Sequence, residues 1–243
     1  MSILAIQKLS KTFGGVRALD AIDVSFEAGE ITALIGPNGS GKTTLINTVT
    51  ALFSQESGTI FVHGEERQRI RPHEIVALGM TRTFQSMRLI EQISVLDNMF
   101  LALTERGPFR ALIEQRNASH EKHAEEILKK IGLWEKRHAH AEKLSYGQRK
   151  LLEIGRALAV DARVYFFDEP FAGLFREMRA IISDILRELR ANGAAVILVE
   201  HDMALVRGLA DTCYVLDSGK VIAHGTVEEV LQKENVIEAY LGK

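Results

Sequence analysis

The sequence predicts an α/β fold, with a core on a mainly parallel β-sheet, an inserted helical part and a small antiparallel β layer near the N-terminus. Three observations indicate this fold. The apolar run 31–35 leads through a glycine-rich turn into a pattern with helical spacing. From residue 160 onward, strand-like and helix-like patterns alternate, which is typical of βαβ units. Between about 86 and 159 the patterns are helical.

The length of 243 residues suits one large domain or a core with a lobe inserted into it. We therefore expect a single domain over 1–243. Residues 1–85 and 160–243 are expected to form the core with its β layer, and residues 86–159 the helical part.

The elements can be justified in chain order. Two stretches around Gly14 and Gly15 predict strands at 5–13 and 18–26, and glycines bracket another predicted strand at 58–64. In the segment 118–132 apolar residues recur on one helical face, and Gly132 is a stop signal. The alternating part predicts strands at 164–169, 194–202 and 212–219, and helices at 176–193 and 203–210.

Composition limits the classes of function. Apolar residues make up 46% and charged residues 26%, which is ordinary for a globular protein with a sizeable core. The net charge is −2, so no basic field draws the chain to nucleic acid, and we expect no nucleic-acid partner. Apolar runs such as 194–199 are too short to cross a bilayer. The single cysteine, Cys213, allows no disulfide within the chain, which fits a reducing cytoplasm.

The glycine-rich turn, GPNGSGKTT at residues 36–44, carries the most functional information. A strand, a glycine-rich turn and a helix form the context in which backbone N–H groups and a helix N-terminus bind phosphate. Lys42 is expected to reach the β- and γ-phosphates, and the Thr43 hydroxyl to ligate magnesium. The sequence therefore predicts binding of a nucleoside triphosphate. The expected nucleotide-binding residues of the loop are Gly36, Pro37, Asn38, Gly39, Ser40, Gly41, Lys42, Thr43 and Thr44.

Two carboxylates end the predicted strand VYFFDE at 164–169. In open α/β sheets, ligands gather at the carboxyl ends of the strands. Asp168 is placed to hold magnesium, and Glu169 to polarise the attacking water as a general base. The alternative is a strand that ends in solvated acids, and the phosphate loop favours the functional interpretation.

A second helix N-terminus stands in KLSYGQRKLLEIGRALA, residues 143–159. Ser145 is a good N-cap residue and Gln148 follows three positions later, which predicts a capping box. Gly147 leaves bare backbone in the first turn, where an anion can approach. A well-capped core helix is the simple interpretation. A second anion site that complements the phosphate loop of another chain is the functional one.

At this point the motifs resemble those of ATP-binding-cassette (ABC) ATPases, over essentially the whole chain. LSYGQ resembles the LSGGQ signature, with Tyr146 in place of a glycine. The resemblance implies that Phe13 stacks on adenine and that Gln85, in RTFQSMRL, senses magnesium and the attacking water. It also implies that His201, in VILVEHD, is the switch histidine that contacts the γ-phosphate.

The resemblance implies a P-loop NTPase (RecA-like) core with a helical signature subdomain, ATP and Mg²⁺ as cofactors, and coupling of ATP hydrolysis to transport. The expected catalytic residues are Lys42, Gln85, Glu169 and His201, and the expected magnesium ligands are Thr43, Gln85 and Asp168. Ser145, Gly147 and Gln148 are expected to face the ATP of a second ATPase subunit, arranged head to tail in a homo- or heterodimer.

Within the family, RTFQSMRLI, LSYGQ, EPFAGL, VEHDM and the ending VIEAYLG look most like ATPase subunits of branched-chain (hydrophobic) amino-acid importers. Such a subunit is expected at the cytoplasmic face of the inner or plasma membrane, with transmembrane permease subunits and, indirectly, a periplasmic or extracellular substrate-binding protein. Alternatives are the ATPase of a lipid or lipopolysaccharide export system, a soluble cassette ATPase acting in DNA repair or translation, and a binding-only regulator.

One departure from the family pattern stands out. After EPFAGL the family usually has Asp or Asn, in a segment that lies across the dimer interface, and this chain has Phe175. A phenyl ring cannot make the polar link between the two ATP sites. The ring is expected either to pack against the facing subunit or to fill the base of the helix that follows.

Overall fold

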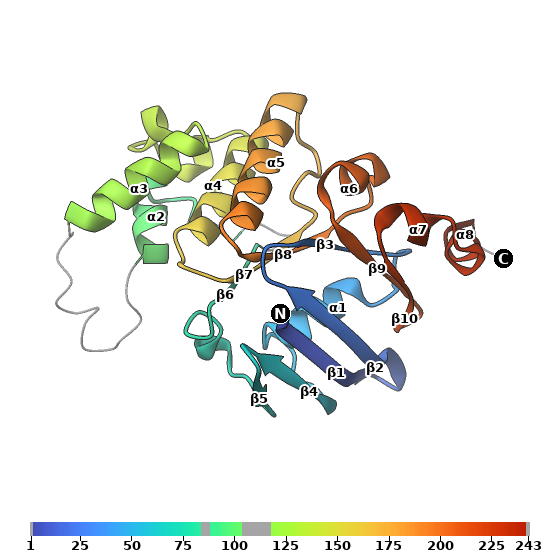
Figure 1. The fold of residues 1–243 in the computed structure, drawn as a ribbon. Coiled ribbons are helices and arrows are strands. Elements are labelled where there is room, and N and C mark those ends of the chain that lie inside the picture. The colour runs from blue at the N-terminus through green and yellow to red at the C-terminus, as the bar shows by residue number, and fades with distance from the viewer. Residues whose placement is uncertain (1, 84–87, 104–117, 242–243) are drawn as a thin grey trace. The chain divides into compact units, whose positions relative to one another are not determined.

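The structure, a computed structural model, describes residues 2–83, 88–103 and 118–241 and divides the chain into two compact units (Figure 1). The core unit comprises Met1–Arg82, Ala162–Pro170 and Ser183–Lys243. The helical unit comprises Thr83–Asp161 and Phe171–Ile182. Helix α5, Arg176–Ala191, begins in the helical unit and ends in the core unit.

The core unit contains an antiparallel sheet of four strands in the order β2-β1-β4-β5. Its strands are β1 (Ser2–Phe13), β2 (Val16–Glu27), β4 (Ser57–Val62) and β5 (Glu65–Arg67). The turn between β1 and β2 contains Gly14 and Gly15, both with positive φ. The predicted N-terminal β layer is thus confirmed, with β4 as its third strand.

A second sheet has six strands in the order β10-β9-β3-β8-β7-β6. They are β3 (Ile31–Ile35), β6 (Met80–Arg82), β7 (Val164–Asp168), β8 (Ala195–Val199), β9 (Thr212–Asp217) and β10 (Lys220–Gly225). All neighbours pair in parallel except β10, which runs antiparallel to β9. The expected mainly parallel sheet is confirmed, and its parallel strands all end at one edge.

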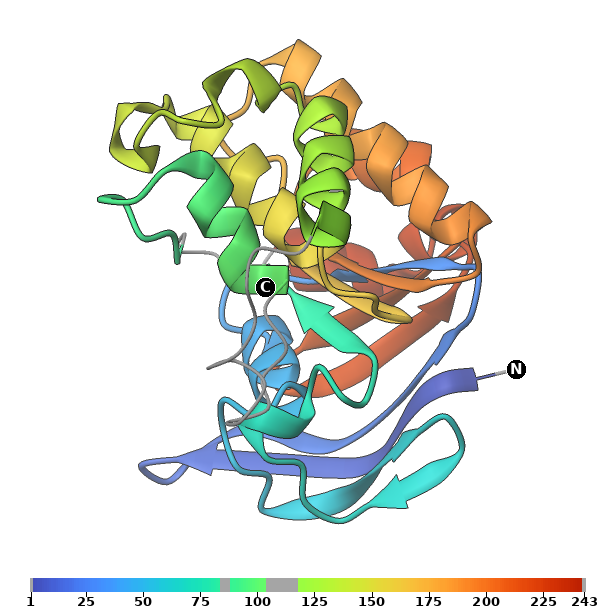
Figure 2. The same ribbon diagram turned by 90° about the vertical axis from the view of Figure 1, so that its left-hand side faces the viewer.

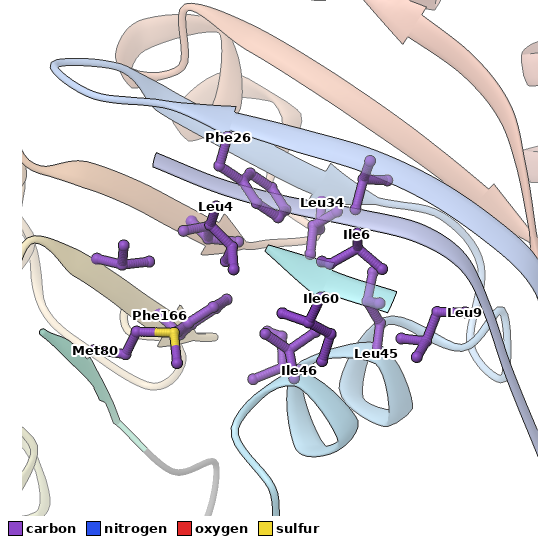
Figure 3. Close-up of a cluster of buried hydrophobic side chains, with 14 of the residues drawn as sticks. Leu4, Ile6, Leu9, Phe26, Leu34, Leu45, Ile46, Ile60, Met80 and Phe166 are labelled. Carbon is purple, nitrogen blue, oxygen red and sulfur yellow. The ribbon is translucent and has the colours of Figure 1, made fainter. Parts of the chain in front are cut away.

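Both faces of this sheet are covered by apolar side chains. Along β3, Leu34 belongs to one buried cluster, and Ala33 and Ile35 to another, as the alternation of side chains along a strand requires. The first cluster joins the two sheets around helix α1, Lys42–Val49, and includes Leu45 and Ile46 of that helix (Figure 3). Burial on two faces explains why β3, β7 and β8 are apolar throughout.

The second cluster is formed with three helices near the C-terminus: α6 (Met203–Leu209), α7 (Val227–Leu231) and α8 (Glu234–Leu241). Asp202 caps α6, because its Oδ1 accepts a hydrogen bond from the backbone N–H of Ala204 at 3.0 Å. Thr226 and Glu229 form a capping box at the start of α7. These local signals start α6 and α7 shortly after the strands β8 and β10, so that their apolar faces meet the sheet.

The helical unit is built from α2 (Val95–Leu103), α3 (Ala118–Lys130) and α4 (Tyr146–Leu158), which contact one another (Figure 2). A side chain at Gly155 would place its Cβ 2.7 Å from Ile131, so the glycine permits the close approach of α4 to the segment after α3. Within the described ranges 2–83, 88–103 and 118–241, no helix is both long and apolar enough to cross a membrane.

Candidate functional site

The loop between β3 and α1 requires glycine at two positions. Gly36 has φ 145°, and a Cβ there would lie 2.0 Å from the carbonyl oxygen of Leu216. Gly41 has φ 106°, and its Cβ would lie 2.7 Å from the carbonyl oxygen of Ala18. Both positions combine a left-handed backbone with no space for a side chain. The loop is therefore held by β2 and β9 in the tight conformation that a phosphate-binding loop needs.

Lys42 is buried, and its ammonium group lies within this loop. Its Nζ donates hydrogen bonds to the carbonyl oxygens of Gly36, at 2.8 Å, and Pro37, at 3.0 Å. Burial lowers the pKa of Lys42, while the nearby carboxylates of Glu169 and Asp168 act in the opposite direction. The predicted phosphate-contacting lysine thus lies near Asp168, which ends β7, and Glu169, which follows it.

Thr43 and Asp168 supply the oxygen groups that the sequence predicts for magnesium. Thr43, in the first turn of α1, is exposed, whereas only 1% of the Asp168 side chain is exposed at the end of β7. A hydroxyl and a carboxylate are hard oxygen donors of the kind that Mg²⁺ prefers. The chemistry of this donor set fits the ion. Gln85, the third predicted ligand, lies outside the described residues.

Glu169 and His201 form a polar pair in the site, with Oε1 of Glu169 and Nε2 of His201 3.0 Å apart. Each residue follows the end of a strand, and β7 and β8 are neighbours in the sheet. Glu169 also has a left-handed backbone, with φ 48°, which costs a residue other than glycine about 1–3 kcal/mol. Its backbone N–H donates to the carbonyl oxygen of Val199 at 3.0 Å, which helps to hold this conformation.

Phe13, the predicted adenine contact, ends β1 and is 42% exposed. Its ring packs edge-on against Phe53, with centroids 5.1 Å apart, and the Lys11 Nζ lies 5.1 Å from the ring centroid. These contacts hold the ring in place, and its partial exposure leaves part of its surface accessible to an aromatic ligand.

The second helix N-terminus, in the helical unit, has the predicted capping box. The Gln148 N–H donates to Ser145 Oγ at 3.3 Å, and the Ser145 N–H donates to Gln148 Oε1 at 3.1 Å. Lys136 Nζ also donates to Gln148 Oε1, at 3.0 Å, and so adds a positive charge beside the cap. The start of α4 thus combines an exposed hydroxyl with a nearby cation, as an anion-contacting helix end needs.

Packing also explains the glycine in this motif. A Cβ on Gly147 would lie 2.3 Å from the sulfur of Met178, so the buried Gly147 lets α4 approach α5 closely. The neighbouring Tyr146 is 45% exposed and its ring lies against Gly173. From the sequence, Gly147 is interpreted only as a place where an anion can approach the backbone. Its role in packing is missed, because Met178 lies 31 positions away in the sequence.

Phe175 is 79% exposed, whereas Phe171 and Leu174 of the same segment are buried. The alternative that Phe175 fills the base of the following helix is therefore wrong: Phe171 and Leu174 take the interior positions. The ring points out of the helical unit, where a second protein surface can reach it.

Arg82, at the end of β6, is a site residue that sequence reasoning missed. Its Nη2 lies 3.8 Å from Asp168 Oδ2, and only 8% of its side chain is exposed. The local sequence MTRTF resembles a strand end and carries no signal that its arginine faces a carboxylate 86 residues later.

A parallel sheet with a glycine-rich loop and a lysine between its β3 and α1 defines a P-loop nucleotide-binding protein. Comparison with known proteins narrows the class. Residues 19–172 match the ABC transporter family, and the chain belongs to this family. It is the ATP-binding, ATP-hydrolysing component of a transporter. This component works with transmembrane permease subunits and is associated with a membrane. The resemblance seen in the sequence motifs is confirmed.

Individual relatives match over the whole chain. The chain is 37% identical to a probable branched-chain amino acid transport ATP-binding protein of Archaeoglobus fulgidus, over 100% of this chain and 96% of the relative. It is 34% identical to a high-affinity branched-chain amino acid transport ATP-binding protein of Escherichia coli K12, over 99% of this chain and 98% of the relative.

Solved structures agree with the predicted fold. The chain superposes on a nucleotide-free ATP-binding cassette of an ABC transporter with a TM-score of 0.88, at 32% identity, and each chain is covered completely. An ABC transporter cassette in an ADP conformation gives a TM-score of 0.86, also at 32% identity and with both chains covered completely. The predicted ABC ATPase fold is confirmed.

Proposed function

We propose that this chain is the ATPase subunit that powers import of branched-chain or other hydrophobic amino acids. The observation that carries the substrate class is the whole-length similarity to bacterial and archaeal proteins named for branched-chain amino acid transport. The proposal extends this substrate class to the present chain. Its nucleotide chemistry rests on the geometry around the phosphate loop.

The phosphate loop and Lys42 hold the triphosphate in this proposal. The amides of the loop and the N-terminus of α1 direct N–H groups at the phosphates. The Lys42 ammonium already lies against the loop carbonyls of Gly36 and Pro37, so a short movement of its flexible side chain brings it to the β- and γ-phosphates. The exposed part of the Phe13 ring stacks on the adenine in this proposal.

Thr43 and Asp168 hold magnesium in this proposal, with Gln85 as a further ligand. A bound ion would supply positive charge that offsets the negative charge of the phosphates. The contribution of the chain is to hold the Thr43 hydroxyl and the Asp168 carboxylate in place, one at the start of α1 and the other at the end of β7.

Glu169 is the proposed general base for the attacking water, and His201 positions it. The 3.0 Å contact between Glu169 Oε1 and His201 Nε2 limits the orientations open to the carboxylate. The left-handed backbone at Glu169 turns this side chain differently from that of Asp168, so that two successive acids serve two roles. His201 is additionally proposed to contact the γ-phosphate.

Two ATPase subunits, identical or different, are proposed to bind ATP between them head to tail. Ser145, Gly147 and Gln148 of one subunit then face the phosphate loop of the other. The capping box and Lys136 support this role, because they leave a helix N-terminus and a positive charge at the surface of the helical unit. The permease subunits receive the resulting motion, and a substrate-binding protein outside the membrane delivers the amino acid.

Uptake of radiolabelled leucine tests the proposed substrate class. The gene is deleted in its own host, and uptake is measured with the wild-type gene or a Glu169→Gln variant returned on a plasmid. We expect the wild type to restore uptake and the variant not to do so. Full leucine, isoleucine and valine uptake in the deletion strain would contradict the proposal. Loss of lipid or lipopolysaccharide export in that strain would favour the export alternative. Since ATP must reach the site, the subunit is proposed to lie at the cytoplasmic face of the membrane.

A further inference from the structure

Arg82 connects two parts of the proposed magnesium site that the sheet does not connect directly. Thr43 belongs to α1, which follows β3, whereas Asp168 ends β7, and β8 lies between these two strands. No strand pairing therefore fixes α1 relative to β7. Arg82 lies at the end of β6, the edge strand beside β7, and its backbone is in register with Phe166.

On one side the guanidinium group of Arg82 is fixed to α1. Its Nη1 donates to Asn47 Oδ1 at 2.6 Å and to Thr50 Oγ1 at 2.9 Å. The Thr50 hydroxyl in turn donates to the carbonyl oxygen of Ile46 at 2.7 Å, so its lone pairs are left to accept from the arginine. Asn47 lies in the C-terminal half of α1 and Thr50 is its C-cap, so these contacts hold the end of the helix whose first turn carries Thr43.

On the other side the same guanidinium group faces Asp168. Arg82 Nη2 lies 3.8 Å from Asp168 Oδ2, and the two side chains are 8% and 1% exposed. A planar guanidinium has several donors in a fixed arrangement, so it can hold two groups at a set angle and separation. Burial strengthens the attraction between the charges and makes the loss of one partner costly.

We propose that Arg82 is a positioning residue for magnesium: it ties the Asp168 carboxylate to α1 and so sets its place relative to Thr43. This inference rests on the proposed function, which assigns Thr43 and Asp168 to the ion. Residues that orient metal ligands affect metal affinity, and their loss typically weakens metal binding by about 10–100-fold. Arg82 touches neither nucleotide nor the attacking water in this proposal.

The test is the magnesium dependence of ATP binding by the full chain, measured by isothermal titration for wild type and Arg82→Gln. In EDTA, where Asp168 has no metal to hold, the ATP affinity of the variant should stay within about twofold of wild type. The magnesium concentration that gives half of the gain in ATP affinity should rise by about 10–100-fold. Arg82→Lys, which keeps a cation but loses the fork, should restore part of this loss.

Two further variants separate positioning from a purely structural role. Thr50→Val removes one anchor of Arg82 but keeps both charges and nearly the same volume. It should raise the magnesium requirement at a temperature where its own unfolding curve shows the variant fully folded. In Asp168→Asn the effect of Arg82→Gln should disappear, because the arginine then has no carboxylate to position. If Arg82→Gln does not fold, Thr50→Val and Arg82→Lys carry the test.

An unchanged magnesium requirement in Arg82→Gln, or in Thr50→Val and Arg82→Lys, overturns the inference. So does an equal loss of ATP affinity in EDTA and in magnesium, which would indicate general damage to the site. If these variants leave the requirement unchanged while Asp168→Asn raises it, the proposed magnesium site stands and only the role of Arg82 fails. If Asp168→Asn also has no effect, the proposed magnesium assignment itself fails.

Discussion

The imidazole Nε2 of His201 lies 3.0 Å from the carboxylate Oε1 of Glu169, at the ends of the neighbouring strands β8 and β7. This contact makes the orientation of the proposed base depend on a side chain from another strand. The two residues are therefore expected to act as one functional unit rather than as independent contributors.

His201→Ala should lower ATP turnover by about 10²–10⁴-fold, because Glu169 loses the group that orients it. ATP affinity, measured by isothermal titration, should fall far less than turnover, since Lys42 and the loop amides remain and only the proposed contact to the γ-phosphate is lost. The double variant His201→Ala, Glu169→Gln should be hardly slower than the slower single variant. Effects that multiply in the double variant would show that the two residues act separately.

Lys42→Ala should remove most of the affinity for Mg-ATP. The Lys42 ammonium lies within the phosphate loop. No other residue of this loop, 36–44, carries a positively charged side chain. Isothermal titration measures the loss. Lys122→Ala, which removes an exposed lysine on α3, is the matched control and should bind Mg-ATP as the wild type does. Near-normal affinity in Lys42→Ala would refute the assignment of the loop.

Phe175→Asn should leave the unfolding temperature almost unchanged, because the ring is 79% exposed in the single chain. The ATPase rate, or its cooperativity in ATP, should change if the ring meets a facing subunit. Phe171→Asn is the matched control in the same segment: Phe171 is 1% exposed, and losing its ring should cost about 3–5 kcal/mol of stability. A Phe175→Asn protein with normal rate and cooperativity would exclude an interface role.

Cys213 gives a prediction for stability against pH. Burial, the largest cause, raises the pKa of the Cys213 thiol from 9.0 to about 11. Above pH 9 the unfolded chain loses this proton before the folded chain does, so the free energy of unfolding falls as pH rises from 9 to 11. The full loss amounts to about 3 kcal/mol.

Chemical unfolding at several pH values, compared between wild type and Cys213→Ala, isolates this contribution from other titrating groups. Between pH 9 and 11 the free energy of unfolding of the wild type should fall relative to that of Cys213→Ala. A difference that stays constant over this range would show that the thiol titrates alike in both states.

Local patterns predicted much of this molecule. The strand, loop and helix around Lys42 and the capping box of Ser145 and Gln148 are encoded within a few neighbouring residues, and the structure confirms both. Alternation of strands and helices after residue 160 predicted the parallel sheet, because a helix between two strands returns the chain so that the second strand runs parallel to the first.

What could not be predicted depends on contacts between distant residues. Both Phe171 and Phe175 could fill a core from their spacing alone, and only the folded structure shows that Phe171 is buried and Phe175 is exposed. Arg82 meets partners 32, 35 and 86 positions away, on α1 and β7. The steric need for Gly147 arises from Met178 on another helix. No local pattern carries such information.

The central claim is that this chain hydrolyses ATP with Glu169 as the base, and one variant tests it most directly. Glu169→Gln keeps the shape of the side chain but cannot accept the proton of the attacking water. Phosphate release and Mg-ATP affinity are measured on the same preparation, with light scattering to follow the dimer. We predict that turnover falls by about 10²–10⁴-fold, that ATP still binds, and that the ATP-bound dimer persists. A variant that hydrolyses ATP at the wild-type rate would contradict the account.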